Sequence, residues 1–137
     1  MFLSSLNDPE KKGFLELASR AISADGKCTP LEEEILASYR YECGMPEFVV
    51  SIRPLEAIIE ELRPAPRRTH RVVILELMGM LLADKDFADK ERQFMQRLAD
   101  TWQVDPSEYR RLTRWAKDFL DIVTDGYRLV GPLEEGR

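Results

Sequence analysis

Residues 21–36 of the chain read AISADGKCTPLEEEIL, and residues 80–95 read MLLADKDFADKERQFM. A constant offset of 59 residues aligns the two stretches. In each, an apolar helix end is followed by an aspartate, six further residues, a glutamate and an amphipathic helix. The duplication predicts a helical body built from two pseudo-repeated helix–loop–helix units. The carboxylates that the alignment pairs are Asp25, Glu32, Asp84 and Glu91.

Helix start and stop signals surround these two units. Asp8-Pro9 and Asp105-Pro106 each combine an N-cap residue with a proline, which fits the first helical position because it has no N–H to satisfy. Thr29-Pro30-Leu31-Glu32 has the form of a capping box followed by a helix, and Gly44 is expected to stop that helix. The final helix is expected to end at Asp125-Gly126.

The remaining segments are also helical in pattern. Residues 46–62 predict an interrupted helix, which Pro54 breaks or kinks near Arg53, and a linker follows at 64–66. Residues 69–83 carry apolar side chains on most sides, which predicts a central, largely buried helix. No segment alternates as a strand does. We therefore predict an all-α, compact bundle of six or seven helices, with a docked segment and tail at 127–137.

Composition restricts the class of protein. A chain of 137 residues that is 44% hydrophobic and 33% charged fits a single domain, 1–137, with its core at about 9–124. No apolar run reaches the roughly 18–20 residues that a membrane span needs, and the first residues lack the pattern of a signal peptide. We therefore expect a cytoplasmic protein with no transmembrane segment. The net charge of −5 argues against nucleic acid as a partner.

The paired carboxylates admit two interpretations. Glu32 fits a capping box and Asp25 precedes a glycine in a turn, so local helix chemistry alone explains the first loop. The second loop holds more acidic residues than one cap requires. If the two loops face one another, their carboxylates form a site for Ca²⁺ or Mg²⁺, which prefer oxygen ligands. The candidate metal ligands are Asp25, Glu32, Asp84, Asp86, Asp89 and Glu91.

Known metal motifs do not match this pattern. In an EF-hand counted from Asp84, the twelfth position needs a bidentate glutamate but holds Met95, and the sixth holds Asp89 in place of glycine. The chain has one histidine and two cysteines, too few for a ferritin-like di-iron site or a Cys/His zinc site. The pattern indicates a hard cation held by carboxylates, or no metal.

Other chemistry-bearing residues are interpreted as structural. His70 is expected at the surface in the first turn of its helix, and Cys28 is expected to serve packing. We expect the clustered arginines to lie on solvated helix faces. The aromatic and β-branched residues assigned to the core are Trp102, Trp115, Phe119, Phe48, Val49 and Val50.

The pair of Ala-Asp…Glu loops, about sixty residues apart, resembles the tellurite-resistance TerB-like family. The matching residues are Ala24-Asp25-Gly26 with Glu32 and Ala83-Asp84 with Glu91, and the resemblance covers roughly residues 9–124. It implies a compact all-helical fold, a cytoplasmic setting, a role in stress response and no established catalysis. It also implies cation binding at the repeated acidic positions.

Three functions follow as hypotheses. The first is a non-enzymatic TerB-like stress-response module that binds a divalent cation, or a protein partner of unknown identity, through its acidic loops. The second is a metal-dependent hydrolase in which the same carboxylates hold Mg²⁺ and activate water. The third is a purely structural protein-interaction module. Direct binding of tellurite is not expected, because an acidic surface repels an anion.

Overall fold

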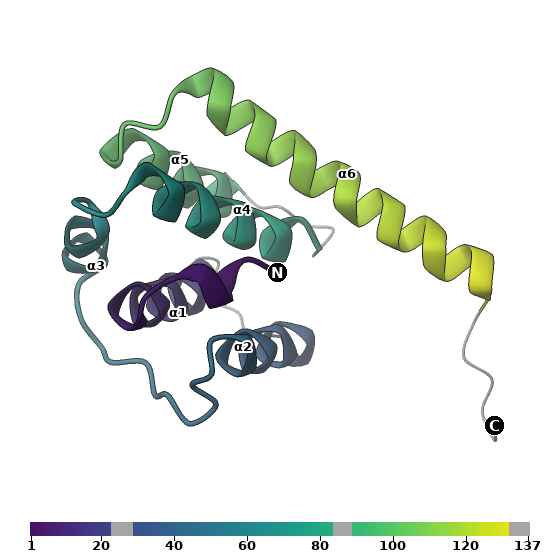
Figure 1. The fold of residues 1–137 in the computed structure, drawn as a ribbon, viewed down its shortest axis with the longest axis horizontal. Helices are drawn as coiled ribbons and strands as arrows, with labels where there is room; N and C mark the ends of the chain where they lie inside the picture. Colours follow the sequence, from purple (N-terminus) through teal and green to yellow (C-terminus); the bar gives the residue numbers. More distant parts are fainter. Residues whose placement is uncertain (23–28, 84–88, 132–137) are drawn as a thin grey trace.

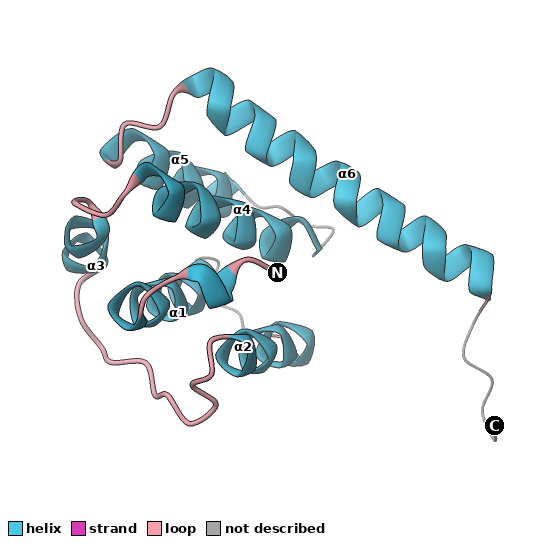
Figure 2. Ribbon diagram, viewed as in Figure 1, coloured by secondary structure: helices cyan, strands magenta, loops and turns pink. Residues whose placement is uncertain are grey.

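The computed structural model describes residues 1–22, 29–83 and 89–131. Within these ranges the chain forms six α-helices and one short 3₁₀-helix and contains no strand, which confirms the all-α prediction (Figures 1 and 2). None of the described helices is both long and apolar enough to cross a membrane. The elements are η1 (Leu3–Ser5), α1 (Asp8–Ile22), α2 (Pro30–Glu42), α3 (Leu55–Leu62), α4 (Arg67–Ala83), α5 (Asp89–Thr101) and α6 (Pro106–Val130).

Helix α4 lies at the centre of the bundle, as its sequence predicts. It packs against α1, α5, α6 and η1, and Figure 1 shows it between α1 and α6. Val73, Ile74 and Leu77 are completely buried, although they point in different directions around the helix axis. Burial on several sides requires a helix that is apolar nearly all round, which explains why α4 has only a narrow polar face.

Helix α1 closes the opposite side of the core and packs against α2, α3 and α4. Asn7 caps it: the Asn7 side chain accepts from Glu10 N at 2.9 Å, and the Glu10 carboxylate accepts from Asn7 N at 2.9 Å. These reciprocal hydrogen bonds form a capping box, and the cap residue is therefore Asn7, one residue before the predicted Asp8. Phe14 is fully buried and meets Tyr39 of α2 edge-on, with ring centroids 5.2 Å apart.

Helices α2 and α5 begin and end at the offset of 59 residues that aligns the sequence repeat. Their C-termini also close alike. Met45 N donates to Arg40 O at 2.8 Å, and Val104 N donates to Ala99 O at 2.9 Å. The residue before each donor has a positive φ: 71° at Gly44, where glycine adopts it freely, and 55° at Gln103, where it is strained. Assembly of the fold from two equivalent packed units stays a prediction.

The segment between α2 and α3 corrects two predictions. Residues 46–54 are not helical, and helix α3 starts only at Leu55, after Pro54 with φ −57° and ψ 138°. Val49 is 83% exposed, so its assignment to the core is wrong, whereas Phe48 and Val50 are half-buried. Proline disfavours helix at the residue before it, and the segment is instead held by Arg53, whose guanidinium binds Glu16 of α1.

Helix α6 corrects the predictions about its own end, about the segment that follows it and about the burial of its aromatic residues. It continues through Asp125-Gly126 to Val130 and ends at Gly131, whose φ of 82° leaves the helical region. Tyr127 is therefore helical and 72% exposed, so it is no part of a docked segment. Trp115 and Phe119, expected in the core, are 44% and 37% exposed, while Trp102 is buried as predicted. Both residues lie on α6, which packs against α4 (Figure 1).

Gly13 marks a close helix crossing and supports a stability prediction. A Cβ at this position would lie 3.0 Å from Leu62 Cδ1 of α3, a side chain that is only 5% exposed and is therefore closely packed. We expect Gly13→Ala to lower the free energy of unfolding by about 1 kcal/mol, since overpacking outweighs the gain in helix propensity. Urea unfolding followed by circular dichroism measures the change.

Gly79→Ala is the matched control for this substitution. Gly79 also lies inside a helix, but nothing stands within 4 Å of a Cβ built there. The control should stabilise the protein by about 0.5–1 kcal/mol through helix propensity alone. A Gly13→Ala protein that gains stability by the same amount would contradict the close crossing of α1 and α3.

Candidate functional site

The predicted acidic site is described only in part. Asp25, Asp84 and Asp86 lie outside the described residues, and so does Cys28. Glu32, Asp89 and Glu91 lie in the first turns of α2 and α5. Convergence of the two acidic loops therefore stays a prediction.

Glu32 has a local structural role. Its carboxylate accepts from Thr29 N at 3.0 Å, and Thr29 Oγ1 accepts from Glu32 N at 3.2 Å, which is the capping box that the sequence predicts. The carboxylate also lies near the positive end of the α2 dipole. Helix capping therefore accounts for Glu32 without a ligand.

Glu91 holds the same position in α5 that Glu32 holds in α2. Each is the third residue of its helix, and they are 4% and 7% exposed, respectively. Asp89, at the first position of α5, is exposed. Across residues 1–22, 29–83 and 89–131, no three His, Cys, Asp or Glu side chains gather closely enough to hold a metal ion.

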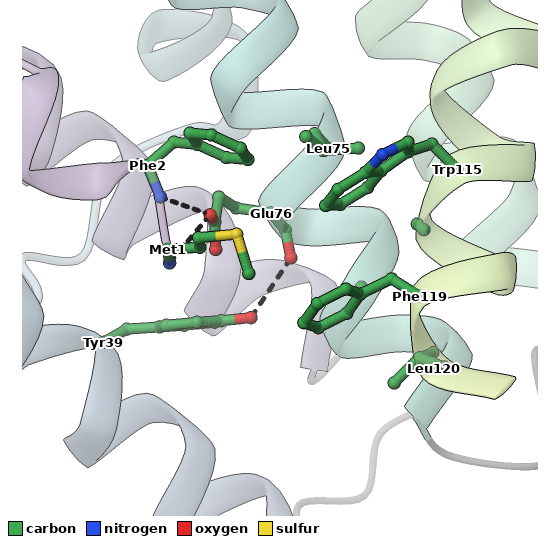
Figure 3. A pocket seen from close by; sticks show the side chains of 10 residues that line it. Met1, Phe2, Tyr39, Leu75, Glu76, Trp115, Phe119 and Leu120 are labelled. Carbon is green, nitrogen blue, oxygen red and sulfur yellow. Dashed lines mark hydrogen bonds and ion pairs between the residues drawn. The ribbon is translucent and has the colours of Figure 1, made fainter. Parts of the chain in front are cut away.

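A different feature stands out among the described residues: an apolar hollow of about 300 Å³ between α4, α6 and the first residues of the chain (Figure 3). Figure 3 shows aromatic rings of α6 on one side, and Phe2 with Tyr39 of α2 on the other. The lining residues are Met1, Phe2, Tyr39, Leu75, Glu76, Gly79, Trp115, Ala116, Phe119 and Leu120.

Glu76 is the polar group of this hollow. Its carboxylate is 8% exposed and accepts from Phe2 N at 2.9 Å and from the Met1 ammonium at 3.0 Å. Glu42 of α2 accepts from the same ammonium at 2.7 Å. Burial lowers the pKa of the Met1 ammonium, but hydrogen bonds to Glu42 and Glu76 outweigh burial and raise it. The carboxylates thus fix residues 1–3 against α2 and α4.

Tyr39 completes the polar contacts of the hollow. Its hydroxyl donates to Glu76 O at 3.1 Å. Burial, together with the nearby Glu76 and Glu42 carboxylates, raises the pKa of Tyr39 above its ordinary value. The phenol is therefore a neutral donor that stays protonated, and it braces the hollow without acting as a base.

The aromatic residues of α6 form one wall of the hollow. Trp115 and Phe119 stack with ring centroids 5.3 Å apart and an interplanar angle of 9°, and Phe2 lies 6.1 Å from Trp115. Beyond them, the apolar surface continues along the outer half of α6. There the exposed fractions are 70% for Ile122, 72% for Tyr127, 87% for Leu129 and 81% for Val130. Exposed apolar side chains gathered on one helix are typical of an interaction surface.

His70 is buried, which corrects the expectation of a surface residue. It does lie in the first turn of α4, but it is only 6% exposed. Its ring stacks on Trp102 at 4.5 Å, and Nε2 lies 2.8 Å from Leu62 O. Trp102 Nε1 donates to Ile59 O at 3.0 Å. The two rings therefore satisfy carbonyls at the C-terminal end of α3, which is a structural role.

The arginines near the start of α4 lie at the protein surface, as expected. Arg67 and Arg71 both bind the Glu108 carboxylate of α6, and Arg63 binds Glu60 within α3. Ion pairs this exposed contribute little to stability. Arg67 and Arg71 lie at the junction of α4 and α6.

Cys43 is a buried thiol whose chemistry can be predicted. Burial raises the pKa of Cys43 from 9.0 to about 11, with Glu42 and Glu76 adding to the effect and Lys11 opposing it. Because the thiolate is the reactive form, we expect the native thiol to hold about a hundredfold less thiolate at pH 8 than an unperturbed cysteine. In the Cys28→Ser variant, reaction with Ellman's reagent should be slow at pH 8 and become fast in urea. Rapid labelling of the native variant would contradict this prediction.

The sequence contains residues that form the hollow, but their pattern does not predict a hollow. Glu76 interrupts the apolar run 72–83, and such an interruption in a buried helix indicates a polar partner. Helical spacing predicts Trp115 and Phe119 in the core, because spacing alone does not say whether another element covers that face.

Comparisons of the chain with models of known protein families, with curated proteins and with solved structures give no match.

Proposed function

We propose that the chain is a non-enzymatic, all-helical interaction module that binds a protein partner along the apolar face of α6 and the adjoining hollow. The observation that carries the proposal is the series of exposed apolar side chains that α6 carries between Trp115 and Val130. A TerB-like role in stress response and a cytoplasmic setting belong to the same proposal, on the strength of the sequence resemblance.

The physical argument rests on the cost of leaving this surface in water. Each large side chain there forfeits about 1.5–3 kcal/mol that full burial would provide. A helix needs an apolar face only where another element covers it, and α6 keeps that face over residues that the bundle does not cover. A partner that supplies the missing cover explains the composition of α6.

Site-specific photo-cross-linking tests the proposal. A benzophenone side chain placed at Ile122 should give discrete covalent adducts when the full chain is irradiated in cells. The matched control is Ile52, which is 99% exposed but lies in the irregular segment away from α6. Adducts at neither Ile122 nor Leu129, or equal adducts at Ile52, would overturn the proposal.

Divalent-cation binding is the second candidate function. It rests on the repeated acidic loops and on Glu91, a buried glutamate at the position of α5 that the helix-capping Glu32 holds in α2. Calorimetry with Ca²⁺ and Mg²⁺ should show binding to the wild-type chain and a loss of binding in Asp84→Asn/Glu91→Gln. Absence of binding heat and of a thermal shift in the wild type would remove this candidate.

A further inference from the structure

Helix α6 is longer than the bundle that supports it. It spans 25 residues, all of them described, and only Ala116 among them is fully buried. Figure 1 shows its outer half extending past the end of α4. The inner half therefore anchors the helix, while the outer half presents Ile122, Leu129 and Val130 to solvent.

The charges in the middle of α6 are segregated along the helix, whereas Glu108 and Arg128 lie outside the two blocks and Arg128 lies 3.5 Å from Asp125. Residues 110–117 carry only positive charges, and residues 118–125 carry only negative ones. Within one helix these blocks meet only at their junction, where Arg114 and Asp118 lie 3.9 Å apart and are 85% and 63% exposed. The basic block consists of Arg110, Arg111, Arg114 and Lys117, and the acidic block consists of Asp118, Asp121 and Asp125.

From this arrangement we propose that the partner on α6 is a second copy of the chain, with the two α6 helices packed antiparallel about a two-fold axis. An antiparallel pair places the basic block of each helix opposite the acidic block of the other, whereas a parallel pair places like charges together. A two-fold contact uses the same patch on both copies, which requires a self-complementary patch. The inference rests on the proposed function and names its partner.

The position of the axis follows from the two blocks. They are balanced about residues 117–118, so Trp115 and Phe119 stand on either side of the axis and near it. Their stacked pair, which forms one wall of the hollow, then meets the same pair of the other copy. An anionic membrane is a poorer fit, because the acidic block would adjoin lipid of the same sign.

The mass of the full chain in solution tests the pairing. Light scattering after gel filtration, at about 0.15 M salt to screen the net charge of −5, should give twice the monomer mass of 15.9 kDa. Ile122→Asp should return the mass to that of the monomer, and Ile52→Asp should leave the dimer intact. A wild-type monomer at every accessible concentration, or a dimer that survives Ile122→Asp, would overturn the inference.

A charge exchange tests the antiparallel arrangement. Arg111 and Asp125 lie on one side of α6 but 14 residues apart, about 21 Å along the axis, so they cannot pair within one copy. Arg111→Asp alone should weaken self-association about tenfold, because it sets like charges against each other across the axis. Adding Asp125→Arg should restore it. A double variant as weak as the single one would reject this geometry.

The cross-linking experiment separates this inference from the proposed function. An adduct at Ile122 with twice the mass of the chain supports the second copy. An adduct of another mass, from a chain that scatters light as a monomer, would leave the interaction module standing and overturn the homodimer.

Discussion

Trp102→Ala is expected to lower the free energy of unfolding by about 3–5 kcal/mol. The indole is 6% exposed, stacks on His70 at 4.5 Å and donates to Ile59 O at 3.0 Å. Its loss leaves a cavity and also removes the donor to a buried carbonyl of α3. Trp102, which follows α5, and Ile59 of α3 lie in different halves of the chain, so the substitution removes a contact that joins the two halves.

Trp115→Ala provides the control for this experiment. Trp115 is 44% exposed, so its truncation should cost less than about 1.5 kcal/mol. Urea unfolding followed by circular dichroism gives both values. The chain has two tryptophans, so each variant also isolates the fluorescence of the other indole. Equal losses of stability would contradict the different burial of the two rings.

Glu16→Ala is expected to cost about 2–3 kcal/mol, somewhat less than the roughly 3–5 kcal/mol for breaking a fully buried ion pair. Glu16 is 4% exposed and receives two hydrogen bonds from Arg53, at 2.7 Å from Nε and 3.1 Å from a terminal nitrogen. Arg53 is itself 31% exposed, which moderates the loss. The substitution should also loosen the irregular segment before α3, and limited proteolysis should then cleave within residues 46–54.

The matched control is Glu61→Ala. Glu61 binds the same guanidinium but is 54% exposed, so we expect a change below about 1 kcal/mol and no new cleavage. If both variants were cleaved equally, the anchoring of the segment by the buried carboxylate would be wrong.

Local chemistry made several features of the fold predictable. Thr29, Pro30 and Glu32 specify the start of α2 through contacts within four residues, and the structure contains the predicted capping box. Asp105 and Pro106 similarly open α6. The run of apolar residues in α4 predicts its central place, because a helix with little polar surface has to be covered on several sides.

Features that depend on distant neighbours were not predictable in this way. Gly126 reads as a helix end, yet the helix continues to Gly131, because an isolated glycine is tolerated within a helix. His70 is buried because Trp102, 32 residues later, supplies a ring to stack on. Nothing in the sequence near His70 indicates that contact.

The candidate sites also differ in how far local sequence could predict them. Spacing pairs Glu32 with Glu91, and the Thr29-Pro30-Leu31-Glu32 sequence predicts the cap role of Glu32, but spacing could not show whether the two glutamates lie close together in the folded chain. The hollow around Glu76 is assembled from α2, α4, α6 and the first residues, so it depends on tertiary packing. Its polar residue was visible in the sequence, whereas its walls were not.

The outer half of α6 has a consequence for the motions of the chain. This half is held mainly by the hydrogen bonds within α6 itself, so its end opens by local fraying. We therefore expect the amide protons beyond residue 121 to exchange with deuterium sooner than those of α4. An occupant seated on this half would slow that exchange and leave the protection of α4 unchanged. The rate of amide exchange at the end of α6 therefore reports whether its apolar face is covered.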